Sequence, residues 1–223
     1  IVRRANVQRA AVGKTKFLLL CVRPAHMKEL LANLKPHLTK EHVLISIAAG
    51  VSLASLKKWS AHNKIVRVMP NLPAEVGLGM SVWRQNGLSG DEKNTVSTIL
   101  KSFGEEIEVK DDKAINAATA VSGSGPAYVF ALLETLAHAA EKLGFKKADA
   151  ETLALMTLHG STVYASHRGE PFAKLAAGVQ TKGGTTEAAF KVLNKKRWQQ
   201  TLAEGVKAAY KRAEEISKLH GSS

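Results

Sequence analysis

The chain lacks the features that would place it in a membrane or in a disulfide-stabilised scaffold. No apolar run in its 223 residues approaches the roughly 20 that a spanning helix needs, and no apolar segment follows Arg3 and Arg4 as in a signal peptide. The single cysteine, Cys21, cannot form an internal disulfide, and its place in the apolar run 17–22 predicts a buried side chain. We therefore expect a cytoplasmic globular protein without a membrane partner.

Aromatic residues are scarce as well, at 5%, whereas 32 Lys and Arg stand against 19 Asp and Glu for a formal net charge of +13. An excess of positive charge attracts anions such as carboxylates, phosphates and nucleic acids. The basic residues are spread along the chain, and aromatic side chains do not alternate with them as they do on a nucleic-acid platform. The charge therefore favours solvated helix faces, and we expect no nucleic-acid partner.

The first half alternates short apolar runs with helical spacing. The run 17–22 is apolar throughout, which predicts a strand buried on both faces, and Pro24 opens a segment whose leucines have helical spacing. Ser52 is suited to cap a short helix. Such alternation predicts an α/β domain with a parallel sheet. The further strands are expected over 43–47, 64–69, 79–84 and 105–109, with a helix over 91–103.

From about Lys113 the texture changes, because Ala, Leu, Glu and Lys dominate and the apolar spacing is helical throughout. The clearest helix covers 126–143, with Pro at its first turn and Gly144 past its end. We therefore predict two domains, an α/β domain over 1–112 and an all-α domain over 113–223. The further helices of the second domain are expected over 148–167, 171–178, 185–195 and 197–219.

Two glycine-rich segments, 121–126 and 181–186, come directly before predicted helices. The first N–H groups of a helix have no intrahelical acceptor and glycines let a ligand approach the backbone, so a carboxylate or phosphate can bind there. A capped inter-helix turn uses the same residue types and stays open as the alternative for either segment. The segment TKGGTT at 181–186 has more glycines and hydroxyls than capping requires, and Thr186 can donate a hydrogen bond to a bound anion.

Other kinds of site find little support. His159 and His167 have no cysteine or carboxylate at ligand spacing, so no metal site is expected. Ser122 and Ser124 have no base placed beside them in the sequence and lie outside a G-x-S-x-G elbow, which argues against a serine hydrolase.

Four segments together resemble a known family. They are ISIAAGVSLASL at 45–56, RVMPNLPAEVGLGMS at 67–81, VSGSGPAYVF at 121–130 and GGTTEAAF at 183–190. Their sequences, order and spacing resemble the signature segments of pyrroline-5-carboxylate reductases. Because several motifs in one order are more specific than one loop, the chain is identified as a member of that family.

The resemblance implies a Rossmann domain over 1–112 that binds NADPH or NADH, and a helical dimerisation and substrate-binding domain over 113–223 that forms a homodimer or a higher homo-oligomer. The implied reaction is hydride transfer to 1-pyrroline-5-carboxylate, which yields L-proline in the last step of proline biosynthesis. In the family pattern Thr186 is the catalytic donor to the ring nitrogen. The implied substrate-binding residues are Val179, Thr181, Gly183, Gly184, Thr185 and Thr186. The implied cofactor-binding residues are Val22, Arg23, Pro24, Ala48, Ala49, Gly50, Pro70 and Asn71, all at the carboxyl ends of expected strands, where open parallel sheets bind ligands.

Some positions depart from the family pattern. Arg23 stands where the family commonly has Lys, and Thr181 and Lys182 stand where Ser and Pro are usual. The glycine-rich G-x-G-x-x-G/A fingerprint belongs upstream of Ile1, so we expect a further few dozen residues there, and a bare sheet edge at the strand 17–22. A reductase-like dimer that is non-catalytic or has altered specificity is the alternative.

Overall fold

The computed structural model describes residues 12–221, which divide into two compact units. Within that range the first unit contains residues 12–126 and 206–221, and the second contains residues 127–205. The predicted domain boundary between residues 112 and 113 stays a prediction.

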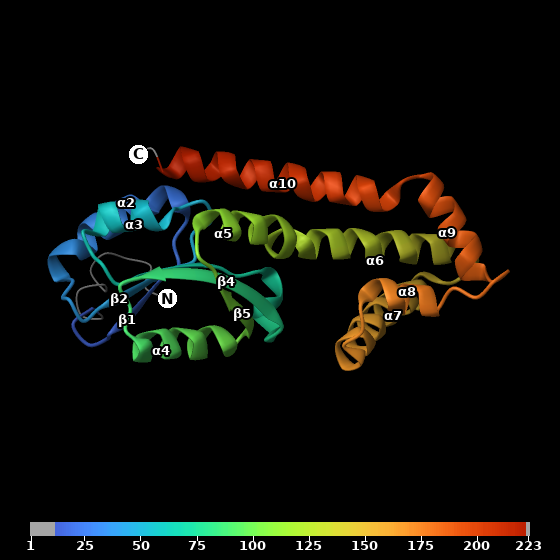
Figure 1. The fold of residues 1–223 in the computed structure, drawn as a ribbon, viewed down its shortest axis with the longest axis horizontal. Helices are drawn as coiled ribbons and strands as arrows, with labels where there is room; N and C mark the ends of the chain where they lie inside the picture. The colour runs from blue at the N-terminus through green and yellow to red at the C-terminus, as the bar shows by residue number, and fades with distance from the viewer. Residues whose placement is uncertain (1–11, 222–223) are drawn as a thin grey trace. The chain divides into compact units, whose positions relative to one another are not determined.

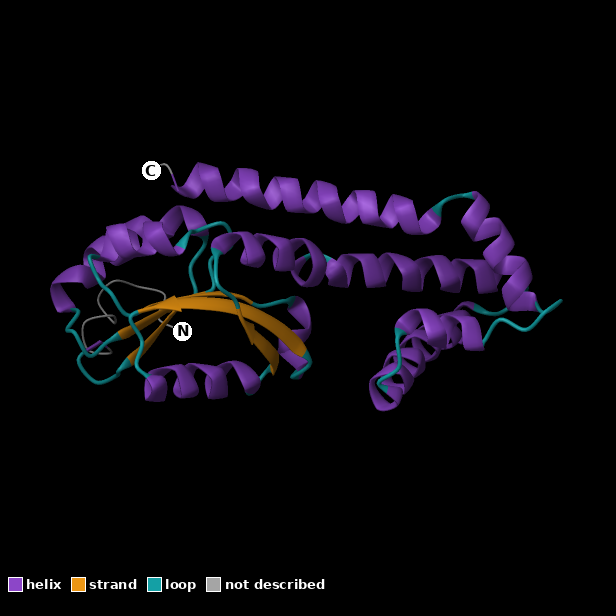
Figure 2. Cartoon of the chain, viewed as in Figure 1, coloured by secondary structure: helices purple, strands orange, loops and turns teal. Residues whose placement is uncertain are grey.

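A sheet forms the centre of the first unit (Figures 1 and 2). Among the described residues its strand order is β1 (Phe17–Leu20), β2 (Val43–Ser46), β3 (Ile65–Met69), β4 (Gly79–Asn86) and β5 (Gly104–Glu108). The pairs β1–β2, β2–β3 and β4–β5 are parallel. The predicted α/β class is therefore confirmed, with a sheet that is mainly parallel.

Two strands, β4 and β5, run opposite to β1–β3, because β4 is antiparallel to β3 and β5 is parallel to β4. The segment between β3 and β4 forms only the short 3-10 turn η2 (Leu72–Val76) in place of a crossover helix. A parallel neighbour needs a crossover of about a dozen residues or more, whereas an antiparallel one can follow a short connection. The prediction of an entirely parallel sheet was wrong for this reason.

Helices cover both faces of the sheet. Helices α2 (Pro24–Leu34) and α3 (Leu53–Ser60) lie on one face, and α4 (Gly90–Lys101) lies on the opposite face (Figure 1). The Ser52 side chain accepts the Ser55 N–H at 3.0 Å, which confirms the predicted cap of α3. Each face has its own apolar core. The α2 and α3 core includes Met27, Leu31, Leu44 and Leu56, and the α4 core includes Val66, Val68, Val96 and Leu100.

The first strand is less buried than its composition predicts. Leu20 is 5% exposed beneath the α2 and α3 core, but Leu19, which faces the other way, is 52% exposed. Cys21, beyond the end of β1, is exposed as well. The predictions of a strand buried on both faces and of a buried cysteine were wrong, because β1 is an edge strand of the described sheet and has a neighbour on one side only. The predicted bare edge is confirmed for the described residues.

The rest of the chain is helical, as predicted. One expectation failed, because 121–126 is not an open loop. Ser124 N donates to the Thr119 carbonyl at 2.8 Å, so most of this segment continues the preceding helix as a π-helical turn. The elements are α5 (Asp112–Ala118), the π-helical turn η3 (Thr119–Gly123), α6 (Gly125–Lys142), α7 (Lys147–Arg168), α8 (Phe172–Gly178), α9 (Thr185–Lys195) and α10 (Trp198–Gly221).

A buried charge network joins the sheet to α5 and to the end of α10 in the first unit. Arg67, 2% exposed, donates to the Asp112 carboxylate at 2.6 Å and to the Asn116 side-chain oxygen at 3.2 Å. Arg84 donates to the other Asp112 oxygen at 3.1 Å, and the Ser217 hydroxyl donates to Asn116 at 3.0 Å. A buried charge is tolerated only when it is paired and hydrogen-bonded, so these contacts hold the four elements together.

The second unit buries very little of its apolar surface. The side chains buried within 127–205 are all alanines, namely Ala137, Ala150 and Ala154. Larger apolar side chains on the same helices are open to solvent, among them Phe130 at 54%, Met156 at 57% and others on α6 and α7. The second unit therefore lacks a large apolar core of its own.

No helix in the described part of the chain is long and apolar enough to cross a membrane.

The close contact between β4 and β5 yields a prediction about stability. Gly104 has a φ of +144°, and an added Cβ would collide with the Gly79 carbonyl oxygen and main chain. Strain of this kind costs on the order of 1–3 kcal/mol. We expect Gly104→Ala to lower the thermal unfolding midpoint by roughly 4 °C or more, measured by circular dichroism. Gly90→Ala, where the new methyl group meets open space, is the matched control. Equal midpoints for the two variants would contradict the prediction.

Glu92 yields a prediction about pH. Lys64 at 2.8 Å, the Ser89 N–H at 2.9 Å and Lys16 at 2.9 Å lower the pKa of its carboxyl from 4.5 to about 2. Because the folded-state pKa is lowered, the carboxylate stabilises the fold above about pH 4.5, and that contribution is lost as the pH falls toward 2.

We expect Glu92→Gln to lower the unfolding midpoint by a few degrees at neutral pH, with a difference from the unmodified protein that narrows as the pH falls through this window. Calorimetry across the pH range measures it. Glu105→Gln removes an exposed carboxylate on β5 as the control. A difference that is constant with pH would contradict the assignment.

Candidate functional site

The carboxyl ends of β1, β2 and β3 meet at one edge of the sheet. In the parallel register Leu20 pairs with Ser46, and Ser46 pairs with Arg67, so the segments that follow these strands lie side by side. This arrangement brings together the residues that the sequence singled out for the cofactor. They are Val22, Arg23, Pro24, Ala48, Ala49, Gly50, Pro70 and Asn71.

The local geometry at this edge suits a ligand that carries phosphate groups. Helices α2 and α3 both begin here, and the amide dipoles at helix starts favour negative charge. Gly50 has a φ of +76°, so the turn before α3 needs glycine, and Ala49 beside it is exposed and small. Arg23 is exposed and its side chain makes no capping hydrogen bond to α2. A dinucleotide can therefore approach the main chain at these segments.

Asn71 has a structural role that the sequence did not reveal. Its side-chain nitrogen donates to the Ser122 carbonyl at 3.2 Å, and its side-chain oxygen accepts the Met80 N–H at 2.8 Å. The side chain thus ties the end of β3 to β4 and to the π-helical turn. With both polar atoms used inside the chain, the predicted cofactor contact of Asn71 falls to its main chain and stays a prediction.

The TKGGTT segment in the second unit connects α8 to α9. Gly184 is the N-cap residue of α9 and offers no side-chain cap, and its N–H donates to the Thr181 carbonyl at 2.9 Å. Gly183 has a φ of +77°, and a Cβ added at Gly184 would collide with the Thr181 hydroxyl. The positive φ favours glycine at Gly183, and a side chain at Gly184 would displace the Thr181 hydroxyl. Without a side-chain cap, the first amides of α9 stay open.

The loop brings the predicted substrate residues together. Thr186, the second residue of α9, is half-buried, and its hydroxyl makes no hydrogen bond to another residue within the described chain. The N–H groups of Thr185 and Thr186 lie in the first turn, where no intrahelical acceptor exists. Val179, at the C-terminus of α8, is 66% exposed. The segment therefore offers main-chain donors, a hydroxyl and an apolar side chain.

Glu187 also belongs to this loop, although the sequence analysis did not single it out. The Gly183 N–H donates to the Glu187 carboxylate at 2.6 Å. Glu187 is the third residue of α9, and a glutamate at that position that reaches back toward the residues before the helix is typical of a capping box. That spacing was the available signal, since Glu187 follows the glycines directly in GGTTEAAF.

Comparison with known proteins defines the class. Residues 2–50 match a family described as NADP oxidoreductase, coenzyme F420-dependent, and residues 112–216 match one described as pyrroline-5-carboxylate reductase dimerisation. Together with the strand-end loops, these matches define an oxidoreductase with a Rossmann-like unit followed by a helical dimerisation unit.

Full-length relatives define the family. The chain is 38% identical over 207 residues to the pyrroline-5-carboxylate reductase of Pisum sativum, covering 92% of this chain and 76% of the relative. It is 36% identical over 218 residues to that of Synechocystis, covering 97% and 81%. The chain belongs to the pyrroline-5-carboxylate reductase family.

Solved structures agree with that assignment. A Coxiella burnetii pyrroline-5-carboxylate reductase has a TM-score of 0.88 at 35% identity, covering 94% of this chain and 79% of that one. A Plasmodium falciparum pyrroline carboxylate reductase with NADP bound has a TM-score of 0.86 at 31% identity, covering 94% and 80%. The resemblance read from the four sequence segments is confirmed, and so are the Rossmann-like fold and the helical dimerisation domain.

Proposed function

We propose that this enzyme reduces 1-pyrroline-5-carboxylate to L-proline with NADPH or NADH. The observation that carries the proposal is the open start of α9, where unpaired main-chain N–H groups and the free Thr186 hydroxyl lie together in a chain of this family. A small acid that contains a ring nitrogen matches that set of donors. The N–H groups suit its carboxylate, and the hydroxyl suits its nitrogen.

The substrate loop divides the work between main chain and side chains. In the proposal the amides of Gly183, Thr185 and Thr186 hold the substrate carboxylate, while Gly184 and Thr181 shape the turn. The exposed apolar side chain of Val179 lies against the ring. Fixing the carboxylate leaves the ring few orientations, which is the main contribution a protein can make to a reaction between two bound molecules.

Thr186 acts at the ring nitrogen. A protonated imine is strongly electrophilic at carbon, so its reduction needs orientation more than acid catalysis. As the C=N bond is reduced, its π electrons become a lone pair on the ring nitrogen, and the Thr186 hydroxyl donates a hydrogen bond to that developing lone pair. The nitrogen keeps its proton and becomes the secondary amine of proline. When bound, the nicotinamide cofactor supplies the hydride that adds to the imine carbon.

The cofactor lies, in the proposal, at the strand ends of the first unit. The turn at Ala48, Ala49 and Gly50 lets it approach the main chain, because no large side chain stands there. Val22, Arg23 and Pro24 are proposed to contact it from the start of α2, and Pro70 and Asn71 from the end of β3.

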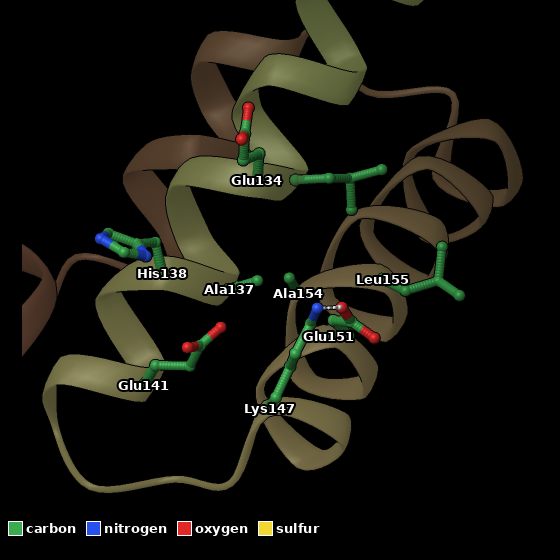
Figure 3. A pocket seen from close by; sticks show the side chains of 9 residues that line it. Glu134, Ala137, His138, Glu141, Lys147, Glu151, Ala154 and Leu155 are labelled. Atoms are coloured by element: carbon green, nitrogen blue, oxygen red, sulfur yellow. Dashed lines mark ion pairs between the residues drawn. The ribbon is translucent and has the colours of Figure 1, made fainter.

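The match to a dimerisation family indicates a homo-oligomer, and we propose a homodimer formed through the helices of the second unit. Figure 3 shows the space between α6 and α7, where Ala137 and Ala154 come from facing helices and acidic side chains lie around them. This hollow has a volume of about 470 Å³. A second copy that covers the exposed apolar side chains would supply the core that the unit lacks alone.

The non-catalytic alternative is not favoured, because the relatives of similar sequence over most of the chain carry the reductase name. The expected cytoplasmic location stays a prediction, as does the absence of nucleic-acid and membrane partners.

The role of Thr186 is testable by removing only its hydroxyl. We expect Thr186→Val to lower kcat/KM for 1-pyrroline-5-carboxylate roughly 100-fold, with an unfolding midpoint close to that of the unmodified full-length protein, because the side chain keeps its shape. Thr186→Ser, which retains the hydroxyl, should recover most of the rate. Consumption of NADPH, followed by nicotinamide absorbance, is the measurement. Unchanged reduction by Thr186→Val would remove Thr186 from the mechanism.

The dimer is testable through an exposed apolar side chain. Phe130 on α6 is 54% exposed in the single chain. A charge at a buried interface position is costly, so we expect Phe130→Glu to convert the dimer to a monomer in sedimentation experiments. Lys57→Glu on α3 introduces the same charge on an exposed position of the first unit as the control. A dimer that persists in Phe130→Glu would exclude this face from the interface.

A further inference from the structure

The carboxylate of Glu187 occupies part of the proposed substrate site. Its Oε2 accepts the Gly183 N–H at 2.6 Å, at the start of α9. A hydrogen bond from a main-chain amide to an ionised carboxylate is about twice as strong as one between neutral groups. It is also the contact that the proposed function assigns to the carboxylate of the substrate, and the inference that follows rests on that function.

Glu187 has a second partner on the same helix. Lys191 lies one turn further along α9, with its Nζ 3.5 Å from Glu187 Oε1. The two side chains are 35% and 73% exposed, so their ion pair is weak. The pair nevertheless means that the glutamate keeps a charged partner when its hydrogen bond to Gly183 is broken. The Glu187 carboxylate therefore has a partner besides the Gly183 amide. When it leaves that amide, it stays beside Lys191 and is not left as an unpaired buried charge.

We propose that Glu187 holds the Gly183 amide in the free enzyme and that the substrate carboxylate displaces it, leaving Glu187 beside Lys191. A ligand with a carboxylate then spends part of its binding energy on the displacement, whereas a neutral imine does not. Glu187 thereby sets how strongly the enzyme prefers acids over neutral imines. A glutamate that only caps α9 would affect the stability of the helix and leave this preference unchanged.

The test compares two substrates of the full-length enzyme, 1-pyrroline-5-carboxylate and 1-pyrroline, which lacks the carboxylate. The quantity measured is the ratio of the KM for the neutral imine to the KM for the acid. Removing the competing hydrogen bond in Glu187→Ala should raise that ratio roughly two- to tenfold, the range of a single hydrogen bond. Glu187→Asp keeps the charge but withdraws it by about one bond length of 1.5 Å, which breaks a contact of 2.6 Å, so its ratio should rise similarly.

Controls separate the explanations. Glu151→Gln removes an exposed carboxylate from α7, 60% exposed beside Lys147, and should leave the ratio as in the unmodified enzyme. If the ratio rose in Glu187→Ala but not in Glu187→Asp, repulsion between the Glu187 and substrate carboxylates would explain the result better than displacement of the hydrogen bond. That outcome would overturn the inference. An unchanged or lowered ratio in Glu187→Ala would overturn it too. If the unmodified enzyme reduced neither imine, the proposed function itself would fail, and the two failures are thus distinguishable.

Discussion

The first N–H groups of every helix have no acceptor within the helix, and this constraint shapes both parts of the structure. A side chain, water or a ligand has to supply the acceptor. In the first unit α3, α4 and α5 do so with their own side chains, since Ser52, Ser89 and Asp111 accept amides of the first turn. Helix α9 begins at Thr185 after Gly184, which has no side chain to offer, and the start of α2 at the proposed cofactor edge also lacks a side-chain cap. A missing cap alone does not mark a site, since α7 and α8 lack one too, and the capped helix α3 starts at the same sheet edge as α2.

The proposed cofactor site in the first unit also depends mainly on the main chain. Parallel pairing of β1, β2 and β3 places three strand ends at one sheet edge, and the paired charges of Arg67 and Asp112 hold α5 against β3 below it. The fold therefore needs few specialised side chains to bind a dinucleotide. Small residues, a glycine turn and helix starts can be sufficient, and the proposed cofactor residues of this chain are accordingly mostly Ala, Gly, Val and Pro.

Much of the fold could be predicted because its elements are regular. Helical spacing located α6 to α10 to within a few residues, and the strands of the described sheet were located from apolar runs and, for β5, from alternation. The failures have physical causes. Whether two strands pair parallel or antiparallel depends on the connection between them, so the antiparallel pairing of β4 with β3 was not predicted. The exposure of Leu19 and Cys21 depends on which elements lie beside them, and an apolar run does not show this. The site loop was found from its glycines, whereas the contact of Glu187, which its capping-box spacing could have suggested, was missed.

We propose that the main-chain amides at the start of α9 bind a small cyclic acid whose ring is reduced by the cofactor. A crystal structure of the full-length enzyme with L-proline tests it most directly. We expect the carboxylate of proline within hydrogen-bonding distance of the Gly183, Thr185 and Thr186 N–H groups, with its ring nitrogen at the Thr186 hydroxyl. Proline bound in another pocket while this loop stays empty would exclude the loop as the substrate site.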